Sequence, residues 1–296
     1  MIHTNPSHTD SLTLADGSSW AIVPEDAAAR YFADIFAKAM QLRPSLRVPE
    51  KKVLLVTADN SGQAEHHFAD SSIAAAPAAG PGKPVVFQTP RDQKASDLAL
   101  QLMRLSLVIC NQVEIQGGLL LHGALVEKSG AGIILAGPGE VGKTTACKRL
   151  PRPWQPLSDD CTLVVRDQNG AYHAHPWPSW STFMFGGNGG SWDVQHSVPL
   201  QAIFLLARSE KDAVKKAGTG EAVCMINECT DQAWWPLANN FGDEQKRHCL
   251  NLLRFNNSCE LAKAIPAYLL HLSRDGKFWN DIEMILTKKP SDSHAR

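Results

Sequence analysis

Hydrophobic and polar residues alternate along the first part of the chain in a way that predicts strand, helix and strand. Residues 11–23 contain two apolar runs around Asp16 and Gly17, a pair typical of a tight turn. Acidic residues then open an alanine-rich helix that runs to about Gln41. The β-branched run at residues 52–57 predicts a buried strand.

A polar stretch rich in alanine, glycine and proline follows at residues 61–83. This composition is typical of a connection between separately folded parts of a chain. We therefore predict two domains, a small α+β module over residues 1–90 and a larger domain over residues 91–296.

The larger domain is predicted to begin with a helix and to continue as strands. Leucines recur at helical spacing within residues 94–116, and a Gly-Gly pair ends that helix. Apolar runs at residues 119–126, 132–136 and 162–165 predict three strands, and an Asn-Gly turn then leads into a returning strand. A hairpin at that point departs from a regular β-α-β progression. We therefore predict an α/β fold with a mixed, partly antiparallel sheet.

A glycine-rich segment between the second of these strands and a short helix carries the strongest chemical signal. It fits the pattern G-x-x-x-x-G-K-[ST] at every fixed position. Small residues let backbone N–H groups converge on phosphate oxygens, the lysine adds a cation, and the next hydroxyl binds Mg²⁺. The alternative, a helix-entry turn that binds nothing, is disfavoured by the strand before it and the helix after it. The predicted phosphate-binding residues are Gly137, Pro138, Gly139, Glu140, Val141, Gly142, Lys143, Thr144 and Thr145.

Two adjacent carboxylates, Asp159 and Asp160, precede the strand at residues 162–165. A phosphate loop needs a carboxylate nearby to hold Mg²⁺ or to accept the proton of an acceptor hydroxyl. Neighbouring side chains leave a strand in different directions, so two acids can divide these tasks. A solvated turn is the alternative, because Asp is common before strands. The phosphate loop favours the functional interpretation.

Composition excludes several classes of partner. The 29 basic and 30 acidic residues give a formal net charge of -1, so no general field attracts nucleic acid or an anionic membrane. We expect no signal peptide in the polar first residues and no membrane-spanning segment, because the apolar runs are short. Seven scattered cysteines without a CxxC pair predict reduced thiols and a cytoplasmic protein.

Together these residues resemble the catalytic domain of HPr kinase/phosphorylase and its shorter relatives. That P-loop kinase family is related in fold to ATP-dependent phosphoenolpyruvate carboxykinase. The resemblance rests on His122 and Gly123 in a strand, on the glycine loop, and on the Asp pair before a hairpin. It extends over about residues 115–285, with late strands at residues 199–206 and 265–269. Among the shorter relatives, the chain looks most like the HPr-kinase-like proteins of SynChlorMet cassettes, which mature ribosomally made peptides.

The resemblance implies a role for each matching residue. Lys143 would bind phosphates and Thr144 would bind Mg²⁺. Asp159 would be the catalytic base toward the acceptor hydroxyl, with His122 beside it tuning its charge, and Asp160 would support the metal or the lysine. The two Asp roles can be exchanged, because neighbouring carboxylates titrate as a coupled pair.

We therefore expect a cytoplasmic ATP- and Mg²⁺-dependent kinase that phosphorylates a Ser or Thr hydroxyl, on a precursor peptide that the N-terminal module helps to bind. Thr145 departs from the family's usual Glu, and the longer C-terminal signature has no counterpart, so HPr is not the expected acceptor. Two alternatives stay open: a kinase of a small hydroxylated metabolite, and a nucleotide-binding regulatory protein without turnover. Formation of a homo-oligomer is also left open.

Weaker signals lie outside these motifs. Trp177 and Trp180 would either stack on a ligand or seal an edge of the core. His173 and His175 share one face of a strand but lack a third metal ligand, so we expect them at the surface. An arginine is expected near the γ-phosphate, and Arg208 and Arg254 are unranked candidates. The glycine-rich residues 186–190 would form a lid or a surface connection.

Overall fold

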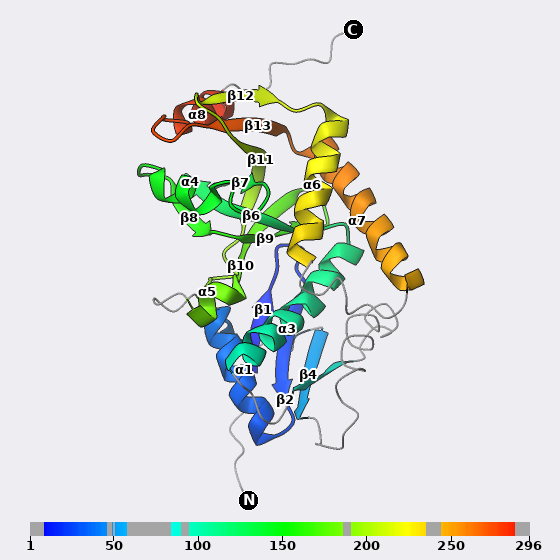
Figure 1. Cartoon of the computed structure of the whole chain (residues 1–296). Helices are drawn as coiled ribbons and strands as arrows, with labels where there is room; N and C mark the ends of the chain where they lie inside the picture. Colours follow the sequence, from blue (N-terminus) through cyan, green and yellow to red (C-terminus); the bar gives the residue numbers. More distant parts are fainter. Residues whose placement is uncertain are drawn as a thin grey trace, which may run out of the picture.

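The computed structural model describes residues 9–45, 49, 51–57, 84–89, 95–185, 191–234 and 244–287. It is an α/β structure built on two mixed sheets, with the N-terminal sheet and the larger sheet at opposite ends of the molecule (Figure 1). The connection predicted at residues 61–83 and the glycine-rich residues 186–190 lie outside the described residues.

The N-terminal sheet has the strand order β3-β1-β2-β4-β5, with β1 antiparallel to its neighbours and β2, β4 and β5 parallel. Its helix α1 begins after Asp26, whose carboxylate accepts hydrogen bonds from the backbone N–H groups of Ala28 and Ala29. The turn at Gly17 and this helix confirm the sequence predictions. The element bounds are β1 (Thr9–Thr13), β2 (Ser19–Pro24), α1 (Ala27–Ala39), β3 (Arg43–Ser45), β4 (Lys51–Thr57) and β5 (Val85–Thr89).

The larger sheet has the strand order β10-β9-β6-β7-β11-β13-β12, and β8 pairs with β6. Strands β7, β11 and β13 are parallel, whereas the pairs among β6, β7, β9 and β10 are antiparallel. The predicted mixed sheet is therefore confirmed. Its strands are β6 (Leu119–Lys128), β7 (Ala131–Ala136), β8 (Gln155–Ser158), β9 (Cys161–Arg166), β10 (Tyr172–Trp177), β11 (Val198–Arg208), β12 (Ala213–Lys216) and β13 (Ala267–Leu272).

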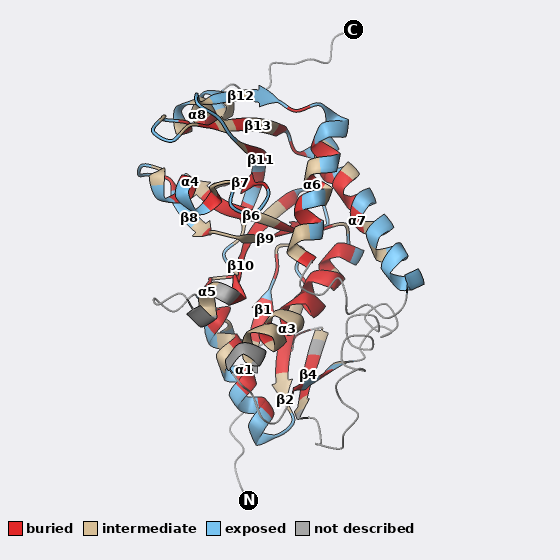
Figure 2. Cartoon of the chain, viewed as in Figure 1, coloured by how far each residue is buried: buried red, intermediate tan, exposed pale blue. Residues whose placement is uncertain are grey.

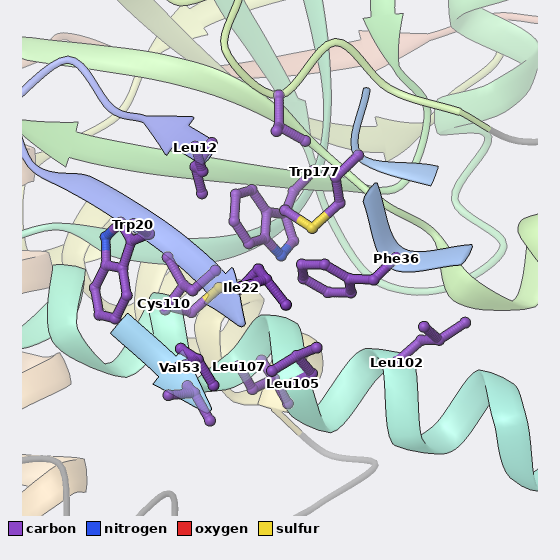
Figure 3. Close-up of a cluster of buried hydrophobic side chains, with 14 of the residues drawn as sticks. Leu12, Trp20, Ile22, Phe36, Val53, Leu102, Leu105, Leu107, Cys110 and Trp177 are labelled. Atoms are coloured by element: carbon purple, nitrogen blue, oxygen red, sulfur yellow. The ribbon is translucent and has the colours of Figure 1, made fainter. Parts of the chain in front are cut away.

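Helix α3 joins the two halves of the molecule. Its leucines lie in one buried cluster with side chains from the N-terminal sheet and from β6, β9 and β10 (Figures 2 and 3). This cluster contains residues from both sides of the predicted domain boundary near residue 90. The boundary itself therefore stays a prediction. The helices are α3 (Ala95–Ile115), α4 (Lys143–Arg149), α5 (Trp180–Phe185), α6 (Thr219–Trp234), α7 (Glu244–Ala264) and α8 (Trp279–Thr287).

Helix α3 bears on the expectation that no segment spans a membrane. By length and composition alone, its window Leu98–Ile115 is apolar enough to cross a bilayer, although no such span was expected from the sequence. In the structure 56% of this window is buried. Core helices of folded domains pass the same test, so this apolar composition is explained by packing.

Candidate functional site

The register of three neighbouring strands brings the predicted motifs together. Strand β6 lies between β7 and β9 and is antiparallel to both. Gly123 pairs with Ala136, the last residue before the glycine loop, and His122 pairs with Cys161, the first residue after the Asp pair. The loop and the two carboxylates therefore flank His122 at one edge of the sheet.

Gly123 permits this close approach. A Cβ atom at this position would lie 2.7 Å from the Cγ2 atom of Ile134 and 3.2 Å from the Cα atom of Ala136. Its carbonyl accepts a 2.8 Å hydrogen bond from the Thr162 hydroxyl, which ties β6 to β9 beside the acids. The glycine after His122 therefore keeps three strands in register at the site.

The glycine loop connects β7 to α4 and closes around its own lysine. Lys143 is buried, and its ammonium donates hydrogen bonds to the carbonyl oxygens of Gly137 (2.9 Å) and Pro138 (3.1 Å). Burial lowers the pKa of Lys143, and the nearby Asp160 charge opposes that shift. Gly142 has φ of 113°, and Glu140 has φ of 62°, which is uncommon for a residue with a side chain.

Asp160 belongs to a chain of three polar side chains. Its Oδ1 atom lies 2.8 Å from Nε2 of His122, and Nδ1 of His122 lies 2.8 Å from Oε1 of Gln232 on α6. The hydrogen bond from His122 lowers the pKa of Asp160, and the charges of His122 and Lys143 act in the same direction. Asp160 is therefore ionised at neutral pH, is hydrogen-bonded to His122, and interacts electrostatically with Lys143.

Asp159 has different surroundings from its neighbour. Burial and the Asp160 charge raise its pKa, whereas Lys148 on α4 lowers it. Burial together with the Asp159 charge raises the pKa of the Cys147 thiol, also on α4, to about 12. The two carboxylates thus diverge: Asp160 interacts with Lys143 and His122, and Asp159 interacts with α4.

Comparison with known proteins places these residues within one family. The family model for the SynChlorMet cassette protein ScmC matches residues 87–287, more than half of the chain. The chain belongs to the ScmC family. The matched region contains the glycine loop, the Asp pair, His122 and Gln232. No curated protein matches the chain.

Two arginines of this ScmC-family chain were candidates for the phosphate site, and they have different surroundings in the structure. The guanidinium of Arg208, at the end of β11, donates a hydrogen bond to the Glu140 carbonyl in the glycine loop. Arg254 is buried on α7, where its Nε atom lies 2.8 Å from Oε2 of Glu114. Arg208 therefore stays a candidate, whereas Arg254 is part of the buried core.

The strand histidines differ from each other, and the expectation for one of them was wrong. His173 lies 3.2 Å from an Asp167 carboxylate oxygen, near the surface. His175 is buried, and both of its ring nitrogens have partners there, the Ala15 N–H and the Val194 carbonyl. Within the described part of the chain, no group of three or more His, Cys, Asp or Glu side chains is arranged to hold a metal ion.

Two further observations complete the description of the site. Thr144 and Thr145 are exposed at the start of α4, so their hydroxyl groups face solvent. Gln232 was missed by sequence reasoning, because α6 carries no motif and a lone glutamine has no pattern. All seven cysteines are free in the structure.

Proposed function

We propose that this ScmC-family chain is an ATP- and Mg²⁺-dependent kinase of the HPr-kinase-like type. It transfers the γ-phosphoryl group to a Ser or Thr hydroxyl on a ribosomally made precursor peptide. The observation that carries the proposal is Asp160, a carboxylate held by His122 that interacts electrostatically with the lysine of a phosphate loop. Membership in a peptide-modification cassette family supports a peptide as the acceptor.

The loop and its surroundings fit a polyphosphate. A Cβ atom at Gly139 or Gly142 would meet no atom within 4 Å, so the loop is open to a ligand there. The Lys143 ammonium now bonds to loop carbonyls and would turn to the β- and γ-phosphates. Thr144 and Asp159 would hold Mg²⁺, which neutralises charge on the phosphates when it is bound.

The described contacts favour an exchange of the two Asp roles relative to the first expectation from the resemblance. His122 forms its hydrogen bond with Asp160 and not with Asp159. The histidine that was expected to tune the base therefore acts on Asp160. Asp159 interacts with Lys148, which lies one helical turn after Thr144 on the same face of α4. We therefore assign the base to Asp160 and the metal to Asp159 and Thr144.

In this reaction the acceptor hydroxyl gives its proton to the Asp160 carboxylate. The hydroxyl oxygen forms a bond to the γ-phosphorus, and the bond from that phosphorus to the bridging oxygen breaks. The electron pair of that broken bond leaves with ADP. Lys143 stabilises the charge on the transferring group, and His122 keeps Asp160 oriented.

Substitution of each acid tests this assignment. Asp160→Asn removes the proton acceptor and keeps the shape, so transfer falls by about 100- to 10,000-fold while Mg·ATP still binds. Asp159→Asn instead weakens the binding of Mg²⁺, so the variant needs more Mg²⁺ and added Mg²⁺ restores part of the rate. A radiolabelled phosphate-transfer assay with the precursor peptide of the same cassette measures both variants.

The same assay distinguishes the alternatives. Labelled metabolite without labelled peptide would support a small-molecule kinase, and tight Mg·ATP binding without ADP would support a regulatory protein. An Asp160→Asn variant with normal turnover would refute the base assignment. The N-terminal module, residues 1–90, is proposed to help bind the peptide.

A further inference from the structure

A pocket of about 220 Å³ lies beside the acid pair, between helices α3, α5 and α6 and strands β6, β9 and β10. Its polar end consists of the linked side chains of His122, Asp160 and Gln232. The described lining contains no residue of the loop 137–144. Its apolar wall is formed by Met103, Leu107, Leu120, Trp177, Pro178 and Trp180.

The pocket therefore opens on the acceptor side of Asp160. In the proposed reaction the base must be within hydrogen-bonding distance of the acceptor hydroxyl. Asp160 interacts with Lys143, which would bind the phosphates, and it also lines the pocket. A group in this pocket is thus next to the hydroxyl that Asp160 deprotonates.

The size of the pocket suits one side chain. An apolar cavity of about 150 Å³ can hold a benzene ring, and pockets for whole small-molecule ligands start at about 300 Å³. The volume here lies between these values, so the pocket accommodates an aromatic or branched aliphatic side chain. A complete hydroxylated metabolite with its hydration shell would not fit.

The polar groups of the wall are mostly engaged within the protein. The Ser106 hydroxyl donates to the Met103 carbonyl at 2.7 Å and accepts from the Trp180 indole N–H at 3.1 Å. The indole nitrogen of Trp177 is buried, so this ring offers the pocket only apolar surface.

We propose that this pocket binds an apolar side chain next to the acceptor Ser or Thr of a peptide. The proposal rests on the proposed kinase function and adds the sequence class of the acceptor. Apolar walls disfavour a charged or polyhydroxylated neighbour, because its polar groups would lose water without gaining partners.

An oriented library of synthetic peptides tests the proposal. Each peptide carries one Ser or Thr, the flanking positions are varied, and transfer from radiolabelled Mg·ATP is measured with the full-length protein. We expect one flanking position to prefer Phe, Leu, Met or Trp over Ala or Asp by about tenfold or more in kcat/KM. Transfer without any apolar preference would overturn the proposal and leave the kinase function standing.

Two variants place a larger side chain in the pocket, one on α3 and one on α6. Met103→Trp on α3 and Ala233→Trp on α6 should each raise the KM of the preferred peptide to that of its alanine analogue, with Mg·ATP affinity unchanged. Met284→Trp on α8 is the control, since this methionine is exposed and outside the pocket lining. Thermal melts identify any variant that fails to fold. If both variants fail to fold, the peptide preference of the wild-type protein tests the proposal by itself.

The outcomes separate the two claims. Loss of the preference for an apolar flanking residue in both folded variants would support the pocket as the peptide subsite. Lost Mg·ATP binding in a folded variant would assign the pocket to the nucleotide and overturn the proposal. Mg·ATP binding without phosphorylation of any library peptide would overturn the peptide-kinase function itself, and the subsite with it.

Discussion

At the scale of single residues, His122 is the best-defined part of the site. Both of its ring nitrogens face acceptor oxygens, one on Asp160 and one on Gln232. The Gln232 amide is oriented by its own NH₂ group, which donates to Glu228 at 3.3 Å. These two contacts, each at 2.8 Å, fix the orientation of the ring beside the Asp160 carboxylate.

Gln232 is therefore expected to act as a positioning residue. Gln232→Leu removes one hydrogen bond from His122 and should lower kcat for phosphate transfer about tenfold, with little change in the KM for ATP. Gln232→Glu keeps the acceptor oxygen and should retain most of the activity. Steady-state kinetics of both variants checks this, and equal losses in the two would contradict the role.

At the scale of elements, His175 joins three segments of the chain. Its Nε2 atom accepts from the Ala15 N–H in the β1–β2 turn at 3.1 Å, and its Nδ1–H donates to the Val194 carbonyl at 2.7 Å. Protonation would place a second N–H against the Ala15 donor. Burial is the main cause that lowers the pKa of His175 from 6.5 to about 4.

This shift predicts loss of stability in acid. Because the unfolded state takes up the proton first, the His175 contribution is complete above pH 6.5 and is lost as the pH falls to about 4. The free energy of unfolding should fall by about 3 kcal/mol from this group across that window. Urea unfolding at a series of pH values measures it.

Variants identify the titrating group. His175→Phe should be less stable at neutral pH but should have a flatter dependence on pH between 6.5 and about 4. His248→Gln, at an exposed position on α7, is the control and should keep the wild-type dependence. An unchanged pH dependence in His175→Phe would exclude this histidine as the cause.

A buried ion pair connects α3, α6 and α7 behind the site. Glu114 accepts hydrogen bonds from Arg254 and from the Trp234 indole, both at 2.8 Å, and the Arg254 guanidinium stacks 3.9 Å from the Trp234 ring centre. Burial raises the pKa of Glu114, and Arg254 opposes this rise. Since Trp234 and Gln232 both lie on α6, this pair helps to place Gln232 against His122.

Removal of one charge should cost more than removal of both. Arg254→Met leaves Glu114 buried without its cation and should lower the free energy of unfolding by about 3–5 kcal/mol. The double variant with Glu114→Gln keeps an acceptor for Trp234 and should recover part of that loss. Urea unfolding of the single and double variants tests this, and strictly additive losses would contradict it.

At the scale of the whole molecule, local signals in the sequence predicted most of the elements. The capped helix α1, the β6–β7 pair and the hairpin β9–β10 follow from apolar periodicity and turn residues. Helices α6, α7 and α8 were not predicted. Polar residues interrupt their apolar faces. The positions of α6 and α7 depend on packing against β6 and α3, and the position of α8 depends on a cluster formed with β7, β11 and β13.

Only the site residues that belong to sequence motifs could be predicted. The glycine loop, His122 and the Asp pair could be found in the sequence because spacing and chemistry identify them together. The contact of His122 with Asp160, and the burial of Arg254 and His175, depend on strand register and helix packing across long sequence separations. No local pattern encodes these distances.

The proposed kinase function depends most on the binding of polyphosphate by the loop around Lys143. Isothermal titration calorimetry of Mg·ATP with the wild-type chain, Lys143→Ala and the exposed control Lys216→Ala tests this directly. We predict that the wild type and Lys216→Ala bind alike and that Lys143→Ala binds about 100-fold more weakly or not at all, because the charged hydrogen bonds to phosphate are lost. Equal binding by Lys143→Ala, or no binding by the wild type, would contradict the account.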